Sequence, residues 1–186
     1  CETCVEPKPA QGNAGAFAQY AVAPTQLCSK TDGVDAVAAA GLPLAGLTAY
    51  QALFTKAGRT FTGDDLGNLK PNQKLLVIGG ATLVGSFAVQ LAKNVGAFVA
   101  CTASAKNNAR GVAKTEACKA LGADVVIDYG QDEWSDVLAG QEYDLVFDTI
   151  GKQEDWANAA KVLKKGGDFI SVANFAADPA ANEANV

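Results

Sequence analysis

The segment that decides the fold is Lys74-Leu-Leu-Val-Ile-Gly-Gly-Ala-Thr-Leu-Val-Gly-Ser-Phe-Ala-Val-Gln-Leu-Ala-Lys93. It has the pattern of a short apolar strand, a tight glycine turn and a helix. An apolar run without polar alternation is typical of a strand that is buried on both faces of a sheet. The turn would leave free backbone N–H groups at the helix N-terminus, where a dinucleotide pyrophosphate can dock. The segment therefore predicts the first strand–helix unit of a dinucleotide-binding domain.

The alternation of strands and helices continues along the chain. Short apolar runs bounded by Gly, Asp or Asn lie at Leu75–Ile78, Phe98–Cys101, Val125–Ile127, Leu145–Phe147 and Phe169–Val172. Amphipathic stretches lie between them, at Val84–Asn94, Ala113–Leu121, Trp134–Ala139 and Asp155–Leu163. Gly96 and Gly122 are placed to end the first two helices, and the cations of Lys164–Lys165 follow the last one. This order predicts an α/β fold with a doubly wound parallel sheet, Rossmann-like in type.

The residues before this region have a different pattern. Residues 15–24 alternate apolar with small or polar side chains, which predicts one antiparallel strand whose partners belong to chain not present here. The Ala- and Leu-rich stretch Gly33–Phe54 predicts helix with a break at Gly41–Pro43, and the glycines and polar residues of Lys56–Asn68 predict a surface loop. We expect a domain remnant over residues 1–32, the dinucleotide-binding domain over 33–174 and an irregular tail over 175–186. Because the sequence contains no Met, either Cys1 follows a cleavage or the chain is a fragment, and we expect a fragment of a longer protein.

Composition excludes several classes of function. The net charge of −5 and the pI near 4.7 argue against a nucleic-acid partner, which needs a basic face. No run of 18 apolar residues predicts a membrane span. The pair Cys1 and Cys4 has the spacing of half a zinc knuckle or of a redox pair, but no second half follows and the chain has no His, so we expect no metal. Five irregularly spaced cysteines favour a reducing compartment, either cytoplasm or an organelle interior.

The glycine turn departs from the usual dinucleotide-binding pattern. Read as G-x-G-x-x-G, it runs from Gly80 to Gly85 and has Thr82 where the middle glycine stands. That glycine normally lets the backbone approach the phosphates. The Thr82 hydroxyl would either bond a phosphate or obstruct it, and a second interpretation is that Gly79, Gly80 and Gly85 serve only strand–helix packing.

The end of the second strand indicates which cofactor is bound. An NAD site places an acid there for the ribose hydroxyls. Here Phe98–Lys106 contains no acid, and Thr102, Ser104 and Lys106 offer hydroxyls and a cation that suit a 2′-phosphate, with Arg110 as a further cation. NADP is therefore preferred to NAD. The alternative is an ordinary solvated polar loop.

At these residues a family resemblance becomes clear. The segments that carry it are Gly15–Tyr20, Ala40–Leu53, Val84–Lys93, Leu121–Tyr129, Tyr143–Gly151 and Leu163–Gly167. The chain resembles the medium-chain dehydrogenase/reductase superfamily, in its zinc-independent quinone oxidoreductase (zeta-crystallin-like) branch, over residues 15 to 174. The resemblance implies a GroES-like catalytic domain around a Rossmann-like domain, so residues 1–32 would be the remnant of the GroES-like domain.

The resemblance also implies positions for the cofactor NADPH. The pyrophosphate would meet Ala81, Thr82, Leu83 and Val84. The 2′-phosphate would meet Ser104, Lys106 and Tyr129, although a core or surface role suits Tyr129 nearly as well. Thr48 and the backbone at Ile150 and Val172 would lie near the nicotinamide. Two departures bear on these positions: Thr82 and Leu83 replace two glycines of the family turn, and about six extra residues, 107–112, follow Lys106.

The resemblance implies an NADP-dependent oxidoreductase that transfers hydride to a quinone, enone or enoyl substrate, and its partners would be a small-molecule substrate and a homodimer mate or a larger complex. The alternative is a non-catalytic Rossmann-like structural subunit with a degenerate nucleotide site, and a pure cofactor-binding sensor is a third hypothesis. The residues identify no catalytic group. Asp144 and Asp148, which flank an apolar strand, are interpreted as strand-end and turn residues.

Overall fold

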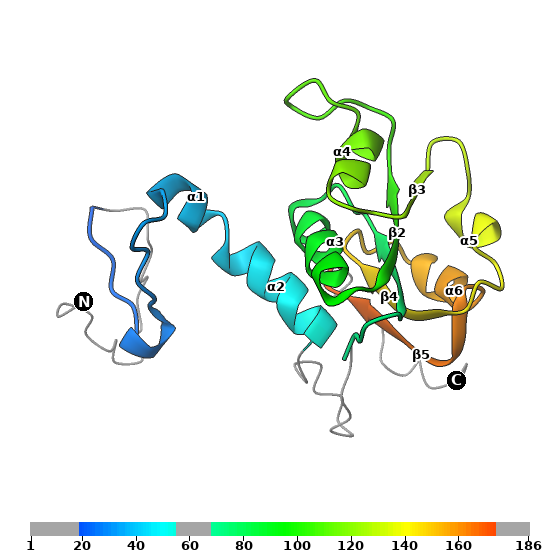
Figure 1. Cartoon of the computed structure of the whole chain (residues 1–186), viewed down its shortest axis with the longest axis horizontal. Helices are drawn as coiled ribbons and strands as arrows, with labels where there is room; N and C mark the ends of the chain where they lie inside the picture. The colour runs from blue at the N-terminus through cyan, green and yellow to red at the C-terminus, as the bar shows by residue number, and fades with distance from the viewer. Residues whose placement is uncertain (1–18, 55–67, 174–186) are drawn as a thin grey trace. The chain divides into compact units, whose positions relative to one another are not determined.

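The computed structural model describes residues 19–54 and 68–173, and its centre is a parallel sheet. The strands are β1 (Lys74–Ile78), β2 (Phe98–Ala103), β3 (Val125–Asp128), β4 (Tyr143–Asp148) and β5 (Leu163–Ser171). Their order is β3-β2-β1-β4-β5. From β1, the chain first adds β2 and β3 on one side and then β4 and β5 on the other. The strand order therefore reverses between β1 and β4. In doubly wound folds, ligands bind at the carboxyl ends of the strands at this point. The predicted doubly wound sheet is confirmed (Figure 1).

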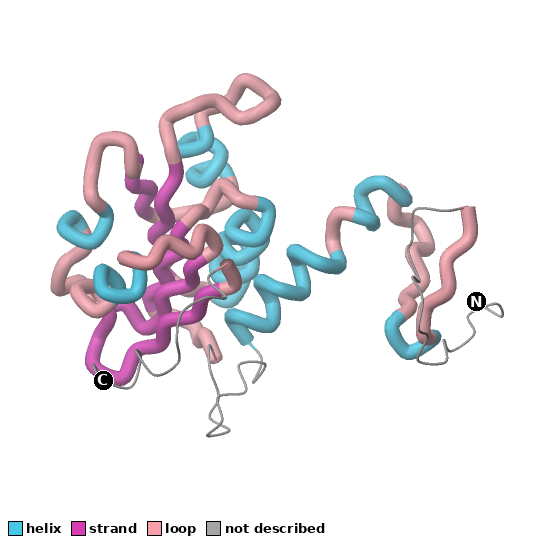
Figure 2. Tube along the Cα trace, turned by 180° about the vertical axis from the view of Figure 1, so that it is seen from behind, coloured by secondary structure: helices cyan, strands magenta, loops and turns pink. Residues whose placement is uncertain are grey.

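Helices cover both faces of this sheet (Figures 1 and 2). One face packs against α2 (Pro43–Phe54), α3 (Leu83–Val95) and α4 (Lys114–Ala120), and the other against α5 (Trp134–Val137) and α6 (Asp155–Ala159). The side chains of β1 divide between the two cores: Leu75 and Val77 face the first group of helices, and Leu76 and Ile78 face the second. Burial on both faces explains why β1 is apolar at every position after Lys74.

The last predicted helix and strand have different limits in the structure. Helix α6 ends at Ala159, not at Leu163, and β5 begins at Leu163, not at Phe169. The reason is that Leu163 already pairs with Tyr143 of β4. Lys164 therefore lies on a strand, where its ammonium group binds the Asp144 carboxylate instead of helix carbonyls.

Contacts divide the chain into two compact units, residues 1–41 and 42–186. The first contains the short helices η1 (Thr25–Leu27) and α1 (Ala36–Ala40), and α1 ends at Gly41 as the sequence predicted. No strand forms in the described residues 19–24, which agrees with the need of a strand for partners. The domain limits themselves stay a prediction. Residues 1–18 with Cys1 and Cys4, the loop over 55–67 and the tail from 174 lie outside the described residues.

The three glycines of the turn all meet close neighbours. A Cβ on Gly85 would lie 2.2 Å from the Gly79 carbonyl oxygen, and a Cβ on Gly80 would lie 2.6 Å from the Cys101 Cβ. Gly79 also has a φ of +88°, which disfavours other residues. The three glycines therefore do serve strand–helix packing, but these contacts do not decide whether packing is their only role. Packing and ligand binding are compatible, because the close contact of α3 with β1 also sets where the helix begins.

We predict that Gly85→Ala destabilises the protein by about 3 kcal/mol or more, because the new methyl group meets backbone that cannot move aside. Gly46→Ala is the matched control, since a Cβ on Gly46 meets nothing within 4 Å in the interior of α2. That control should stabilise by about 0.5–1 kcal/mol. Chemical denaturation of the intact protein measures both, and equal effects would contradict the described packing.

Candidate functional site

The N-terminus of α3 presents backbone donors at the carboxyl edge of the sheet. Among the described residues, no acceptor bonds the N–H groups of Ala81, Leu83 and Val84. Ala81 and Leu83 are exposed, and Leu83 has an exposed fraction of 61%. Free N–H groups at the start of a helix, together with the positive end of its dipole, form a binding site for an anion. The geometry of this turn can therefore hold a phosphate group.

Thr82 is the N-cap of α3, and its hydroxyl is used within the fold. Its Oγ1 accepts a hydrogen bond from the Gly85 N–H at 2.9 Å and lies 3.0 Å from the Thr149 Oγ1. Thr149 itself lies 2.8 Å from the Ile78 carbonyl oxygen, which can only accept. The Thr149 proton therefore goes to Ile78, and Thr82 donates to Thr149.

This arrangement changes the expectation for Thr82. Its hydroxyl has no proton left for a phosphate, and the side chain is folded toward the end of β4. Sequence reasoning missed Thr149, because the partner lies 67 residues away on another strand. Among the described residues the cap leaves the N–H groups of Ala81, Leu83 and Val84 without an acceptor, so the Thr82 hydroxyl does not occupy them.

Thr102 is not an open phosphate ligand. It is 2% exposed, its hydroxyl accepts a hydrogen bond from the Gly79 N–H at 3.0 Å, and its carbonyl accepts one from the Gly80 N–H at 2.9 Å. These bonds fasten the glycine turn to β2. The expected contact of Thr102 with a 2′-phosphate is therefore corrected: the residue is too deeply buried to reach one.

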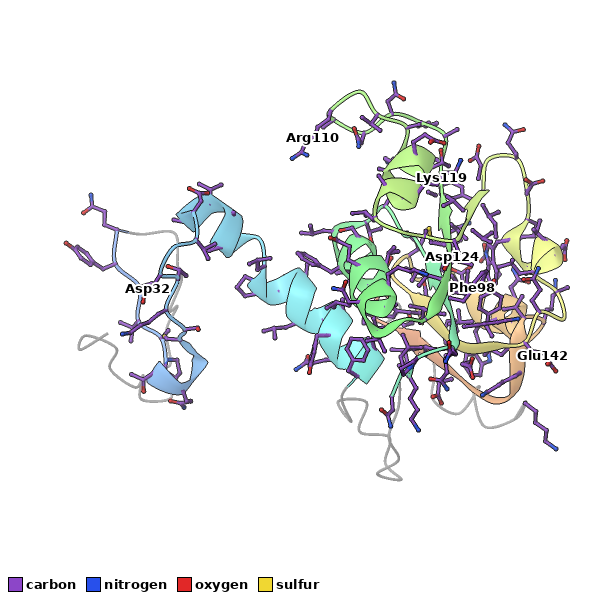
Figure 3. All side chains as sticks on the ribbon, in the orientation of Figure 1. Asp32, Phe98, Arg110, Lys119, Asp124 and Glu142 are labelled. Carbon is purple, nitrogen blue, oxygen red and sulfur yellow. The ribbon has the colours of Figure 1, made fainter. Side chains whose placement is uncertain are left out.

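The loop after β2 closes on itself and leaves its cations at the surface. The Lys106 carbonyl accepts from the Lys114 N–H, and Asn108 accepts from the N–H groups of Arg110 and Val112. The extra residues therefore form a compact turn beyond Lys106, and Figure 3 shows Arg110 on its outer part. Lys106 is exposed at the base of this turn, and Ser104 is 6% exposed.

An acid from the next strand approaches the same loop. The Asp128 Oδ1 accepts from the Ala105 N–H at 3.2 Å and from the Gly130 N–H at 3.0 Å. The two bonds join the loops that follow β2 and β3. Tyr129, which is 54% exposed, lies between them, and its N–H donates to the Ala103 carbonyl.

A pocket of about 140 Å³ opens beside these loops. Its lining is mainly apolar and comes from β1, β2 and the segments after β3 and β4: Ile78, Thr102, Tyr129, Trp134, Ile150, Lys152 and Asp155. The pocket thus brings together three predicted site residues, Thr102, Tyr129 and Ile150. An apolar slot with an aromatic ring at its edge suits a flat ring system.

Asp155 is the unexpected residue of this pocket. It is 1% exposed, and its Oδ2 has no hydrogen-bond partner among the described residues. Burial, and next the negative charge of Asp148, raise the pKa of Asp155 to about 6. The sequence did not single it out, because an acid in the first turn of a helix is ordinary at the surface.

Asp148 organises the ends of β4 and β5. Its Oδ1 accepts from the N–H groups of Ile150 and Gly151, and its Oδ2 accepts from the Ser171 hydroxyl. Its carbonyl accepts from the Val172 N–H, so the two positions expected near a nicotinamide, Ile150 and Val172, are held around one residue. The interpretation of Asp148 as a turn residue is confirmed.

Asp144 has the corresponding structural role at the other end of β4. It accepts from the Lys74 N–H at 2.7 Å and binds the Lys164 ammonium group. Burial acts to raise the pKa of Asp144, but the bonds from Lys164 and Lys74 outweigh it and lower the pKa. Thr48 lies on α2, where its hydroxyl donates to the Leu44 carbonyl at 2.7 Å.

Two other kinds of site do not form in the described part of the chain. No three His, Cys, Asp or Glu side chains gather there as a metal site. Likewise, none of the helices within residues 19–54 and 68–173 has both the length and the apolar character needed to cross a membrane.

Comparison with known proteins gives the family. A family model described as zinc-binding dehydrogenase matches residues 84–186, which is more than half of the chain. The chain belongs to this family. The predicted membership of the medium-chain dehydrogenase/reductase superfamily is thereby confirmed.

The relatives include reductases and quinone oxidoreductases. The 2-methylene-furan-3-one reductase of Solanum lycopersicum is 34% identical over 89% of this chain and 37% of its own length. The chloroplastic NADPH-dependent alkenal/one oxidoreductase of Arabidopsis thaliana is 36% identical over 89% of this chain and 38% of its own. The quinone oxidoreductase structure from Coxiella burnetii has a TM-score of 0.62 at 31% identity, covering 77% of this chain and 39% of that one. The chain therefore spans about two fifths of the length of the curated relatives it matches.

We predict a pH-dependent stability difference between the native protein and Asp155→Asn. The folded pKa of about 6 exceeds the unfolded value of about 3.9, so the folded state binds the proton more tightly. The native protein therefore loses stability as pH rises between these two values, whereas the uncharged amide does not. From pH 4 to pH 8 the free energy of unfolding of the variant should rise relative to the native protein by about 2 kcal/mol.

Denaturant titrations of both proteins at the two pH values measure this difference. Asp132→Asn, which removes an exposed carboxylate from the loop before α5, controls for the loss of one charge. An Asp155→Asn effect that is the same at both pH values would show that this carboxyl is ionised as readily in the folded chain as in the unfolded one.

Proposed function

We propose that this chain is the NADPH-binding part of a reductase that transfers hydride to a quinone, an enone or an enoyl thioester. The observation that carries the proposal is the set of free N–H groups at Ala81, Leu83 and Val84, at the switch point of a doubly wound sheet. In this fold that position receives the pyrophosphate of a dinucleotide. The residues present fit such a group, because the Thr82 side chain is turned into the helix cap.

The two halves of the cofactor would lie on opposite sides of the glycine turn. Ser104, Lys106 and Tyr129 lie at the ends of β2 and β3 and would meet the adenosine half, with Lys106 as the cation for the 2′-phosphate. No acid occupies the tip of β2, and Asp128 is engaged by two backbone N–H groups. NADPH is therefore favoured over NADH.

The other half of the cofactor would lie over the ends of β4 and β5, where Asp148 fixes the backbone of Ile150 and Val172. When bound, the nicotinamide supplies a hydride, and a proton from a donor or water completes the reduction. The names of the relatives support this class of reaction, since they include NADPH-dependent alkenal/one reduction and quinone reduction. Relatives described as chloroplastic also support a reducing organelle interior as the compartment.

The test is a fluorescence titration of the intact protein with NADPH and with NADH. We expect a Kd for NADPH in the micromolar range or better. Lys106→Ala should weaken NADPH binding by about tenfold and leave NADH binding nearly unchanged, because only NADPH carries the 2′-phosphate. Lys119→Ala is the matched control, since that exposed lysine pairs with Glu116 on α4.

Two results would contradict the proposal in different ways. No binding at millimolar NADPH would favour the non-catalytic Rossmann-like subunit. Binding of both dinucleotides with equal affinity, unaffected by Lys106→Ala, would retain the dinucleotide site and reject the 2′-phosphate contact. Turnover of NADPH with a panel of quinones and enones would then separate an enzyme from a cofactor-binding sensor.

A further inference from the structure

The glycine turn is tied to the end of β4 by a pair of threonine hydroxyls. The Thr82 Oγ1 lies 3.0 Å from the Thr149 Oγ1, and Thr149 is the first residue after β4. The Thr149 hydroxyl donates to the Ile78 carbonyl at 2.8 Å, so it can serve Thr82 only as an acceptor. Both threonines are half-buried, and they lie 67 positions apart in the sequence. The pair is therefore a tertiary contact that joins the proposed pyrophosphate site to the segment after β4.

The pairing of β4 with β1 does not depend on the Thr149 hydroxyl. The register of these strands ends at Ile78 and Asp148, and the Thr149 N–H then donates to the Ile78 carbonyl at 3.0 Å. The hydroxyl adds a second bond to the same carbonyl and accepts the proton of Thr82. What the hydroxyl contributes beyond the backbone is thus the orientation of the Thr82 side chain.

The orientation of Thr82 matters because this residue stands where dinucleotide-binding turns usually have a glycine. A threonine side chain has three staggered rotamers about its first torsion. In the observed one, the hydroxyl accepts from the Gly85 N–H at 2.9 Å and donates to Thr149. Two bonds from different elements thus hold the same rotamer, in which the hydroxyl is directed into the fold.

We propose that Thr149 is a positioning residue for the pyrophosphate of the dinucleotide, an inference that rests on the proposed NADPH function. Its hydroxyl holds Thr82 in the helix cap and so keeps the N–H groups at the start of α3 open to the ligand. These groups, which have no acceptor within residues 19–54 and 68–173, belong to Ala81, Leu83 and Val84. Because the cap is in place before the ligand arrives, the turn needs little reordering on binding, which favours affinity. Thr149 acts through Thr82 and takes no part in hydride transfer.

Fluorescence titration of the intact protein with NADPH tests this role. Thr149→Val replaces the hydroxyl with a methyl group of similar size, which leaves Thr82 without its acceptor and retains the backbone bond to Ile78. We expect the Kd for NADPH to rise by about fivefold to tenfold. Thr149→Ser, which retains the hydroxyl, should restore a Kd within about twofold of the native value. Thr31→Val, at an exposed position of the first compact unit, controls for the exchange of threonine for valine and should keep the native Kd.

A second background separates positioning from a general loosening of the fold. Because Thr149 acts through Thr82, its replacement should change the Kd by less than about twofold once Thr82→Val has removed the partner hydroxyl. A structural role exerted through the Ile78 carbonyl would instead weaken binding equally in both backgrounds. Circular dichroism verifies that each variant is folded. Thr149→Ala, which removes the hydroxyl without placing a methyl group beside Gly79, serves if the valine variant does not fold.

Each remaining outcome decides the matter. Unchanged NADPH affinity in Thr149→Val or Thr149→Ala would overturn the role of Thr149 and leave the NADPH site intact. Tighter binding would also overturn it, because a released Thr82 hydroxyl would then be bonding the phosphate. A loss that Thr149→Ser does not reverse, or that is equally large in the Thr82→Val background, would make Thr149 a structural residue only. Failure of the native protein to bind NADPH would reject the proposed function, and the role of Thr149 with it.

Discussion

A chain of hydrogen bonds at the start of α3 is the constraint on which the site depends. It runs from the Gly85 N–H through the hydroxyls of Thr82 and Thr149 to the carbonyl of Ile78. This chain ties the helix N-terminus to β1 and to the end of β4. Gly85 allows the close approach, since any side chain there would meet the turn itself. The helix therefore starts with N–H groups at Ala81, Leu83 and Val84 that have no acceptor in the described part of the chain, which is the local requirement for binding an anion.

At the same edge of the sheet, two carboxylates that accept hydrogen bonds from backbone N–H groups connect neighbouring loops. Asp128 joins the loops after β2 and β3, and Asp148 joins those after β4 and β5. Backbone N–H groups and the Ser171 hydroxyl engage both oxygens of Asp148, and backbone N–H groups engage the Oδ1 of Asp128. Asp155 differs, because its Oδ2 is fully buried and has no hydrogen-bond partner within residues 19–54 and 68–173. Burial of this carboxyl acts against its ionised form and raises its pKa to about 6.

Much of the fold was predictable from the sequence, because strands buried on both faces carry continuous apolar runs and helix ends carry glycines such as Gly96, which adopts a left-handed conformation with φ of +87°. The boundary at β5 was not, since pairing with Tyr143 draws Leu163 into the sheet and overrides the local helical pattern. Within the site, the roles of Thr82, Thr102 and Asp155 depend on partners that are distant in the sequence. Residue type alone indicated a hydroxyl or an acid, but not whether the fold already used it.

The central claim is that the outer N–H groups of the turn bind the pyrophosphate while the Thr82 hydroxyl stays within the helix cap. Backbone amide NMR of the intact, isotope-labelled protein during titration with NADPH tests it most directly. The amide resonances of Ala81, Leu83 and Val84 should shift strongly at saturation, whereas that of Gly85, which remains bonded to Thr82, should shift little. Unchanged resonances at Ala81, Leu83 and Val84 when the protein is saturated with NADPH would contradict the claim.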